Sequence, residues 1–367
     1  MGNHLNRIIN VGIVLRVFIE LVLFSFSTSE DLPATFVFGD SLVDVGNNNY
    51  LVSFSKANYV PNGIDFGKPT GRFTNGRTIS DIIGQELGMD LTPPYLAPTT
   101  VGPVILKGVN YASGGGGILN FTGKVFGGRL NFDAQIDCFA NTRQDIIISI
   151  GFPAALNLLN RSLFSVSIGA NDFINNYLTP ALPFSERKTV SPQFFVTKMI
   201  SKLRLQLTRL FNLGARKIVV ANVGPIGCIP SQRDANPGAG DSCISFPNQL
   251  AQLFNAQLKD LVAELNSNLE GSSFVYADVY QILEDILQNY VALGFVNPYS
   301  ACCHVAGSFG GLVPCGPTSK VCWERSKYVF WDPYHPSDAA NVIIAKRLLD
   351  GGSNYIWPRN IRGLVQS

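Results

Sequence analysis

Two segments near opposite ends of the chain carry the residue types of nucleophilic catalysis. Ser41 directly follows Gly39-Asp40 after a short apolar run, which would place its hydroxyl at the carboxyl edge of a buried strand. Near the other end, Asp332 precedes His335 by three residues in a proline-stiffened turn, where a carboxylate can hold the tautomer of an imidazole base. Taken singly, an ordinary turn and a loop histidine are the simpler interpretations.

Two segments in the middle of the chain could donate hydrogen bonds to a developing negative charge. Four glycines, 114–117, follow an Ala-Ser pair and offer backbone N–H groups that no side chain shields. A phosphate-binding loop is the alternative, but no Gly-Lys-Ser/Thr follows. Asn171 lies in Gly-Ala-Asn-Asp after another apolar run, so its amide could face an oxyanion, or it could simply form a turn.

The elements that must position these residues alternate along the chain. Short apolar runs that stop at glycine or polar residues predict buried strands, and apolar positions at helical spacing between them predict helices. This alternation predicts a mostly parallel sheet covered on both faces, with ligands beyond the carboxyl ends of the strands. The predicted strands are Thr35–Phe38, Val109–Ala112, Leu163–Ile168, Lys217–Val223 and Ser273–Val279, and the predicted helices contain Phe195–Leu210, Leu250–Leu265 and Ser337–Leu349.

Length and composition exclude several classes of protein. The 367 residues allow one large domain or two modest ones, and 46% hydrophobic with 15% charged residues excludes disorder. The net charge is +2 without any Lys/Arg-rich run, which argues against a nucleic-acid partner. No stretch of about 18 uninterrupted apolar residues occurs, so the mature chain is not expected to span a membrane.

The N-terminal segment has the composition of a secretory signal. Arg7 precedes a mostly apolar run from Val11 to Phe26, and small residues follow it, so cleavage is expected near Ser27 or Ser29. Two charged residues interrupt the run, and a buried helix or a membrane anchor is the alternative.

This interpretation gives a signal peptide at 1–29 and one secreted domain at 30–367. Asn120 and Asn160 each begin an Asn-x-Ser/Thr tripeptide, the acceptor for glycosylation in the secretory pathway. The expected location is therefore extracellular, with the cell wall as one possible site.

Seven cysteines also favour an oxidising compartment. Four lie within 302–322, around a Gly/Pro-rich segment. A zinc site is one interpretation, but the cluster has no Cys-x-x-Cys pair and no second nearby histidine, and such clusters more often form disulfides. Cys228 and Cys243 flank a polar loop that a disulfide could close, which leaves Cys138 unpaired.

The four segments together resemble the GDSL lipases, also called SGNH hydrolases, over nearly the whole mature chain. Family blocks occur in order, as Phe38-Gly39-Asp40-Ser41, an Ala-Ser-Gly-Gly stretch, Gly169-x-Asn171-Asp172 and Asp332-x-x-His335. The detail resembles the plant branch at Asp44-Val45-Gly46-Asn47-Asn48-Asn49-Tyr50, Phe173-Ile174-Asn175-Asn176-Tyr177, Asn222-Val223-Gly224-Pro225-Ile226-Gly227-Cys228 and Gly311-Leu312-Val313-Pro314-Cys315-Gly316. The resemblance implies an α/β fold of three α/β/α layers with a mostly parallel, flavodoxin-like central sheet.

The resemblance also implies a serine esterase or lipase that needs no metal and no cofactor. Ser41 would attack an ester carbonyl, His335 would take its proton, and Asp332 would orient His335. The oxyanion would be held by the Ser41 N–H, a glycine N–H and the Asn171 side chain. Gly114 matches the family glycine best, but four consecutive glycines leave that register open.

Three functions remain compatible with these residues. A secreted hydrolase of carboxylic esters, acting on lipid or other acyl esters, is the expectation. The same triad would make an acyltransferase if a hydroxyl acceptor replaced water, and a non-catalytic secreted binding protein is the third alternative. The sequence does not indicate the natural substrate, its acyl-chain length or the oligomeric state.

Overall fold

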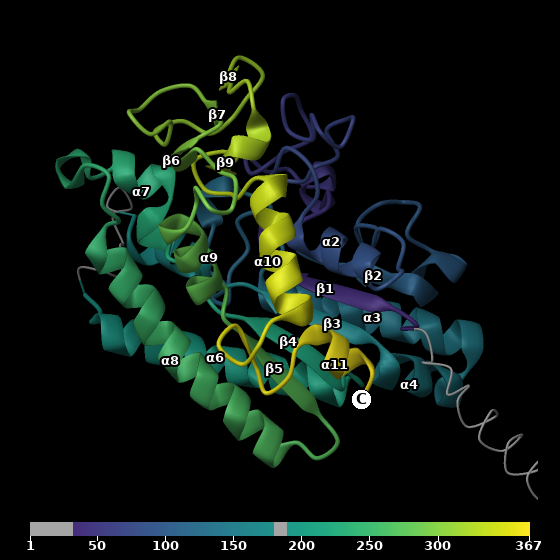
Figure 1. The fold of residues 1–367 in the computed structure, drawn as a ribbon. Coiled ribbons are helices and arrows are strands. Elements are labelled where there is room, and N and C mark those ends of the chain that lie inside the picture. The colour runs from purple at the N-terminus through teal and green to yellow at the C-terminus, as the bar shows by residue number, and fades with distance from the viewer. Residues whose placement is uncertain (1–31, 180–188) are drawn as a thin grey trace, which may run out of the picture. The chain divides into compact units, whose positions relative to one another are not determined.

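The central element of the fold is a six-stranded sheet with strand order β10-β5-β4-β3-β1-β2 (Figure 1). The computed structural model describes residues 32–179 and 189–367, so the expected signal peptide lies outside the described residues. Five strands run parallel and β10 pairs antiparallel with β5. The strands are β1 (Thr35–Gly39), β2 (Gly108–Asn110), β3 (Leu163–Ser167), β4 (Lys217–Ala221), β5 (Ser273–Ala277) and β10 (Ile356–Trp357).

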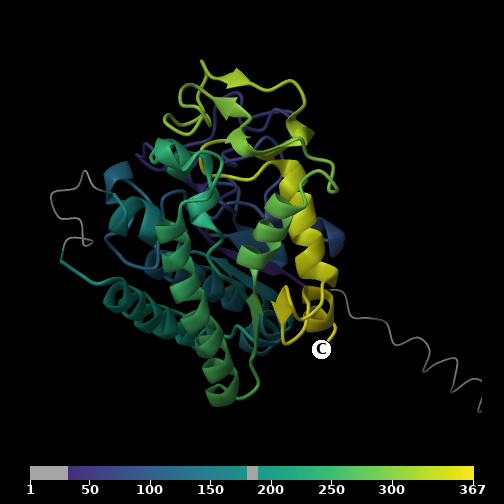
Figure 2. The ribbon, with the colours of Figure 1, turned by 60° about the vertical axis from the view of Figure 1, so that its left-hand side comes forward.

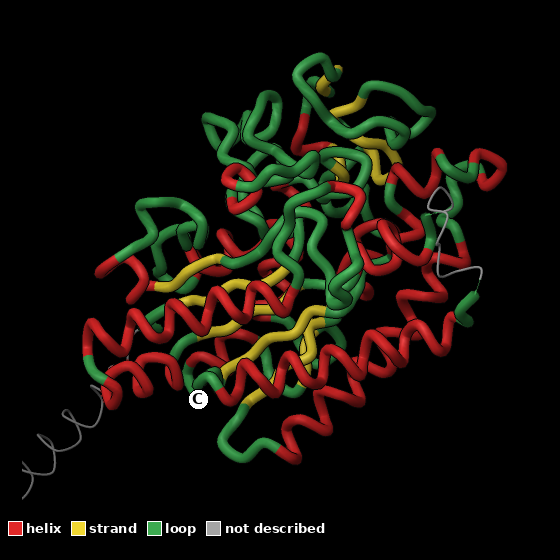
Figure 3. Tube along the Cα trace, turned by 180° about the vertical axis from the view of Figure 1, so that it is seen from behind, coloured by secondary structure: helices red, strands yellow, loops and turns green. Residues whose placement is uncertain are grey.

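Helices cover both faces of the sheet, which gives three layers (Figures 1 and 3). Each layer shares its own hydrophobic core with one face of the strands. One layer contains α3 (Phe132–Ile150), α4 (Phe152–Arg161), α6 (Pro192–Asn212) and α8 (Ser245–Asn268), and the other contains α2 (Ile79–Glu86), α9 (Val279–Gln288), α10 (Asp338–Asp350) and α11 (Ile361–Val365). In Figure 2 the long green helix α8 lies to the left and the yellow helix α10 to the right. The predicted three-layer α/β/α fold is thus confirmed.

Alternate side chains along β4 divide between the two cores, because successive residues of a strand point to opposite faces. In β4, Ile218 and Val220 pack with the layer of α3, α6 and α8. Val219 and Ala221 pack with the layer of α9 and α10. A strand that is buried on both faces has a continuous apolar run in its sequence, and this pattern predicted β4.

Smaller elements lie beyond the carboxyl edge of the sheet, with β6 to β9 at the top of Figure 1. They include α5 (Ala170–Asp172), a π-helical turn (Phe173–Tyr177), α7 (Pro230–Asp234), the pair β6 (Asn297–Ala301) and β9 (Tyr328–Phe330), and the pair β7 (Cys303–His304) and β8 (Lys320–Val321). Short 3₁₀ turns occupy Asn47–Tyr50, Gly102–Lys107, Lys124–Phe126, Ile226–Cys228, Pro237–Ala239 and Arg325–Lys327.

Side-chain caps set where two of the predicted elements begin and end. The side chain of Ser337 accepts a hydrogen bond from the Ala340 N–H and caps α10, as the sequence predicts. The predicted strand Ser273–Val279, in contrast, ends at Ala277. Asp278 accepts a hydrogen bond from the Gln281 N–H and starts α9, so the chain leaves the sheet two residues earlier than its apolar run suggests.

Six cysteines form three disulfides, Cys228–Cys243, Cys302–Cys322 and Cys303–Cys315. Cys138 is a half-buried free thiol. The disulfide interpretation of the cluster is therefore confirmed, and so is the pairing across the polar loop. The two bridges in the cluster staple the long segment that leads from β6 to β9.

Candidate active site

Ser41 lies directly beyond the carboxyl end of β1, an interior strand of the sheet. The Asp40 N–H still donates to the Ser167 carbonyl oxygen of β3, at 3.2 Å, before the chain turns away. Gly39 permits this close approach, because a Cβ at that position would lie 2.4 Å from the same carbonyl oxygen. The strand therefore delivers Ser41 to the floor of a cavity at the edge of the sheet.

The loop between β9 and α10 brings His335 and Asp332 to Ser41, although 294 residues separate His335 from Ser41 in the chain. His335 Nε2 lies 2.7 Å from Ser41 Oγ, and His335 Nδ1 lies 2.8 Å from each carboxylate oxygen of Asp332. Asp332 Oδ1 also accepts the backbone N–H groups of Tyr334 and His335, both at 2.8 Å. These backbone bonds fix the carboxylate on the same turn that carries the imidazole.

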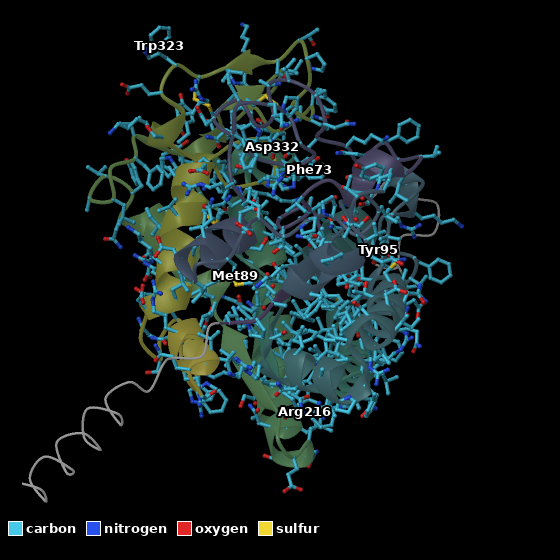
Figure 4. The ribbon with its side chains drawn as sticks, turned by 90° about the vertical axis from the view of Figure 1, so that its right-hand side faces the viewer. Phe73, Met89, Tyr95, Arg216, Trp323 and Asp332 are labelled. Carbon is cyan, nitrogen blue, oxygen red and sulfur yellow. A yellow bond between two sulfur atoms is a disulfide. The ribbon has the colours of Figure 1, made fainter. Side chains whose placement is uncertain are left out.

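Phe73 contributes to the placement of the imidazole and was not indicated by any motif. Its ring centroid lies 5.3 Å from that of His335. Figure 4 labels Phe73 beside Asp332 in the upper part of the molecule. The imidazole is thus held by a carboxylate on one side and by an aromatic ring on another. A single aromatic residue in a loop gives no sequence signal for such a role.

Asn171 lies in α5, directly after β3, and lines the same cavity. Its Oδ1 accepts a hydrogen bond from Asn175 Nδ2 at 2.5 Å, which fixes the orientation of the amide. Its Nδ2 donates to the Gly116 carbonyl oxygen at 3.0 Å. An amide nitrogen carries two hydrogens, so one remains for a ligand in the cavity.

Within the glycine run the structure favours Gly115 over Gly114 as the residue that faces the site. The Gly114 N–H donates to Asp44 Oδ2 at 3.0 Å, so the sequence-based assignment places the oxyanion donor on an N–H that is already bonded. Gly115 lines the cavity and has a φ of +81°, a conformation that glycine adopts without strain. Side-chain types cannot distinguish four identical glycines, whereas their hydrogen-bond partners and their positions relative to the cavity do.

A cavity of about 200 Å³ contains Ser41, His335, Asp332, Gly115 and Asn171 in its wall. The rest of the wall is mainly apolar and comes from the layer of α2, α9 and α10 and from the loops above the sheet. Its apolar members are Leu42, Phe54, Phe73, Ile79, Phe126, Ile174, Pro225, Ile226, Ile229, Val279, Leu283, Pro314, Phe330, Pro336 and Ile344. A substrate with an apolar portion can therefore place it beside the Ser41 hydroxyl.

Three fully buried carboxyl groups surround the site outside the predicted residues. Burial raises the pKa of Asp40 to about 7, and it raises the pKa of both Asp44 and Asp172 to about 6. Hydrogen bonds from backbone N–H groups act in the opposite direction in all three. In the described ranges, no group of three or more His, Cys, Asp and Glu side chains could hold a metal ion.

We expect Asp40→Asn to change the pH dependence of stability. Because the pKa of Asp40 in the folded state lies above the ordinary value of 3.8, the native state binds more protons than the unfolded state between about pH 4 and pH 7. This group therefore lowers the free energy of unfolding as the pH rises through that window. Asparagine cannot ionise, and its Oδ1 can still accept the Leu42 N–H, which donates to Asp40 at 3.1 Å.

Relative to wild type, Asp40→Asn should gain about 2–3 kcal/mol in free energy of unfolding between pH 5 and pH 8. Urea denaturation at the two pH values measures this difference. Asp145→Asn, which alters an exposed carboxyl group, serves as the control and should follow wild type at both pH values. Parallel pH dependences of wild type and Asp40→Asn would contradict the expectation.

Hydrogen-bonded Ser, His and Asp side chains, here at the carboxyl edge of a mostly parallel sheet, are the arrangement that serine hydrolases share. Comparisons with known proteins narrow the class. The family described as GDSL-like Lipase/Acylhydrolase matches residues 35–348. The chain therefore belongs to this family, and it is a carboxylic ester hydrolase.

Relatives from Arabidopsis thaliana agree with this assignment over most of their length. GDSL esterase/lipase At4g16230 is 65% identical over 335 residues, which cover 91% of each chain. GDSL esterase/lipase At2g23540 is 53% identical over 91% of this chain and 88% of its own. GDSL esterase/lipase 7 is 43% identical over 96% of this chain and 99% of its own. The resemblance to the plant branch of the family is thus confirmed.

Proposed function

We propose that this protein is a secreted serine esterase that hydrolyses lipid or other acyl esters through an acyl-enzyme on Ser41. The observation that carries the proposal is the continuous hydrogen-bonded chain from Ser41 through His335 to Asp332 on the wall of an apolar cavity. Nucleophile, base and orienting carboxylate stand in the order that acyl transfer requires.

In the proposed reaction, Ser41 Oγ attacks the ester carbonyl carbon while its proton passes to His335 Nε2. Asp332 stabilises the imidazolium that forms and holds Nδ1 protonated. His335 then gives the proton to the leaving alcohol, and the carbonyl re-forms as an acyl-enzyme. A water molecule, deprotonated by the same imidazole, attacks this acyl group and releases the acid and Ser41.

Three donors are proposed to hold the oxyanion of the tetrahedral intermediate. They are the Ser41 N–H, the Gly115 N–H and Asn171 Nδ2. The support for Gly115 is its place on the cavity wall next to Gly114, whose own N–H is bonded to Asp44. The support for Asn171 is that Asn175 orients its amide so that Nδ2 lies on the side of the glycine run.

The proposed substrate carries an apolar acyl group. The cavity wall is formed mainly by aliphatic and aromatic side chains, and Ile226, Ile229, Leu283 and Ile344 among them are buried residues of the fold. Lys56 and Tyr59 are among the polar members outside the triad. An acyl chain would gain about 25 cal/mol for each Å² of apolar surface that it buries against such a wall.

The proposed location is extracellular, following cleavage near Ser27 or Ser29. Three disulfides support an oxidising compartment, because such bonds persist mainly outside the cytosol. Asn120 is exposed and available for a glycan, whereas Asn160 is half-buried near the end of α4. No helix within the described part of the chain is long and apolar enough to cross the bilayer.

A panel of esters tests the proposed function on the purified full-length secreted protein. p-Nitrophenyl esters with acyl chains of increasing length should be turned over, with kcat/KM rising as the chain fills the apolar wall. A binding protein without catalysis would show none of this turnover. Binding of the esters without release of p-nitrophenol would therefore contradict the proposal.

Asn171→Ala should lower kcat by about 10²–10³-fold, because the transition state loses one oxyanion donor. KM should change little, since the ground-state carbonyl carries less charge than the oxyanion. Steady-state kinetics and melting temperature, measured on the same samples, check the expectation. If Asn171 only shapes a turn, the variant will have a lower melting temperature than wild type and will keep wild-type kcat at temperatures at which it is folded.

A further inference from the structure

The glycine run 114–117 is tied at its start to the loop that follows the nucleophile. Asp44 is completely buried, and its Oδ2 accepts the Gly114 N–H at 3.0 Å. Its Oδ1 accepts the N–H groups of Gly46 and Asn47 at 2.7 and 2.8 Å. One carboxylate therefore fixes the first glycine of the run relative to the turn beyond Ser41.

A second buried carboxylate holds the chain just beyond the other end of the run. Asp172 is also completely buried, and its Oδ2 accepts the Ile118 N–H at 2.9 Å. Its Oδ1 accepts the Leu119 N–H at 2.9 Å and the Thr122 hydroxyl at 2.7 Å. Because Asp172 directly follows Asn171, it fixes the glycine run relative to the amide that faces the cavity.

Asn48 adds a third attachment to the same run. Its Nδ2 donates to the Gly114 carbonyl oxygen at 2.8 Å, and its Oδ1 accepts the Ser113 hydroxyl at 2.6 Å. Asp44 and Asn48 both belong to the Asp-Val-Gly-Asn-Asn-Asn-Tyr segment, for which the proposed reaction supplies no task. The structure gives this segment a task, which is to bind the glycine run on both its N–H and its carbonyl side.

We propose that Asp44 and Asp172 are positioning residues that hold the glycine run so that Gly115 presents its N–H to the oxyanion. This inference rests on the proposed function and deepens it. Between the two held ends, the Gly116 N–H bonds to the Ser113 carbonyl oxygen at 2.9 Å. The Gly115 N–H meets no acceptor among the described residues, and this glycine lines the cavity.

Buried carboxylates suit this task for a physical reason. A glycine run has no side chains to pack, so its conformation must be fixed through its peptide groups. Hydrogen bonds from N–H groups to a carboxylate are roughly twice as strong as those to a neutral acceptor. An oxyanion donor is effective only if it already stands about 2.7–3.1 Å from the place where the charge develops. Loosening either end should therefore reduce transition-state stabilisation more than substrate binding.

Asp44→Asn and Asp172→Asn test the inference with little change in volume. In each variant Oδ1 can keep its backbone donors. The new Nδ2 group, itself a donor, would face the Gly114 N–H in Asp44→Asn and the Ile118 N–H in Asp172→Asn, so neither N–H would keep its acceptor. Asp234→Asn is the matched control. Asp234 also binds backbone N–H groups through its carboxylate, those of Phe309 and Gly311, but it does not line the cavity.

The readouts are kcat, KM, melting temperature and the inhibition constant of an alkyl trifluoromethyl ketone. Ser41 Oγ adds to the ketone carbon, its proton passes to His335, and the carbonyl oxygen becomes an oxyanion in the place of the intermediate's. In either variant we expect kcat to fall about 10- to 100-fold with KM within about twofold, and the inhibition constant should rise by the same factor as kcat/KM falls. The Asp234→Asn control should match wild type in all three constants.

Assays are run well below the melting temperature of each variant, so that a loss of kcat cannot come from unfolding. Because each carboxylate holds a different end of the glycine run, one variant that folds is sufficient to test the inference. Wild-type kcat and inhibition constant in a folded variant would overturn the inference, and so would a kcat loss without a matching change in the inhibition constant. A wild-type protein that hydrolyses esters but resists the ketone would instead contradict the proposed function. The two failures are thus distinguishable.

Discussion

Replacing Ser41 by alanine should lower kcat for ester hydrolysis by about 10⁴–10⁶-fold, the largest effect expected for any single substitution in this protein. The change removes the hydroxyl oxygen that lies 2.7 Å from His335 Nε2 and would form the acyl-enzyme. Because Ser41 is half-buried beside a cavity, its truncation should change the free energy of unfolding by less than about 0.5 kcal/mol. Single-turnover and steady-state assays with a p-nitrophenyl ester measure the loss.

Ser167→Ala is the matched control for this experiment. Ser167 lies at the end of β3 and lines the same cavity, but its hydroxyl does not bond to His335. Its substitution should leave kcat within a few-fold of wild type. A folded Ser41→Ala variant that retains more than a tenth of wild-type kcat would show that another group is the nucleophile.

Asp332→Asn should give the second largest effect, a loss of about 10³–10⁴-fold in kcat with the fold intact. Asp332 Oδ1 accepts the N–H groups of Tyr334 and His335, and an asparagine Oδ1 can keep both bonds. The Nδ2 group would then occupy the position of Oδ2, 2.8 Å from His335 Nδ1. An amide donor at that position forces the imidazole proton onto Nε2, where it faces Ser41 and abolishes the base.

The measurement for Asp332→Asn is kcat/KM across pH together with the melting temperature. We expect the melting temperature to stay close to that of wild type, because the backbone bonds of the turn survive. A loss of less than tenfold in kcat would mean that the orientation of His335 does not depend on the carboxylate. In that case Phe73, which packs against the ring, would be the main support of the base.

The sheet could be predicted because its strands are buried on both faces. The runs that form β1, β3, β4 and β5 are mainly apolar, and each observed strand lies mostly or wholly within its predicted range. Their carboxyl ends were harder to predict, because the apolar run continues into the next element. The cap formed by Asp278 determines where β5 ends, and a hydropathy pattern does not reveal such a cap.

The helices of the two outer layers were only partly predictable. The helices α6, α8 and α10 carry apolar residues at regular helical spacing or a clear cap, and the sequence predicted all three. The helix α3 was missed, because its face toward the core mixes apolar residues with the buried Gln135 and Thr142. Gln135 is nevertheless important, since its amide group bonds to both the N–H and the carbonyl oxygen of Gly39 below the nucleophile.

Some residues of the candidate site could be predicted from local motifs, whereas others depend on contacts between distant parts of the chain. Ser41, Asp332, His335 and Asn171 stand in short motifs, and the structure brings them to one cavity. The glycine that faces the cavity could not be chosen, because Gly114 and its neighbours are chemically identical. The choice depends on Asp44, 70 residues earlier in the chain, whose carboxylate takes the Gly114 N–H.

The most direct test of the proposed mechanism is covalent labelling with an alkyl fluorophosphonate, followed by peptide mass spectrometry. The hydroxyl oxygen of an activated serine displaces fluoride from phosphorus, so the reagent reports the nucleophile itself and not merely a loss of activity. We predict one phosphonyl group per chain, on the peptide that contains Ser41, with labelling absent in Ser41→Ala and strongly slowed in Asp332→Asn. Labelling of a different residue with loss of activity, or an active enzyme that the reagent leaves unmodified, would contradict the assignment of Ser41.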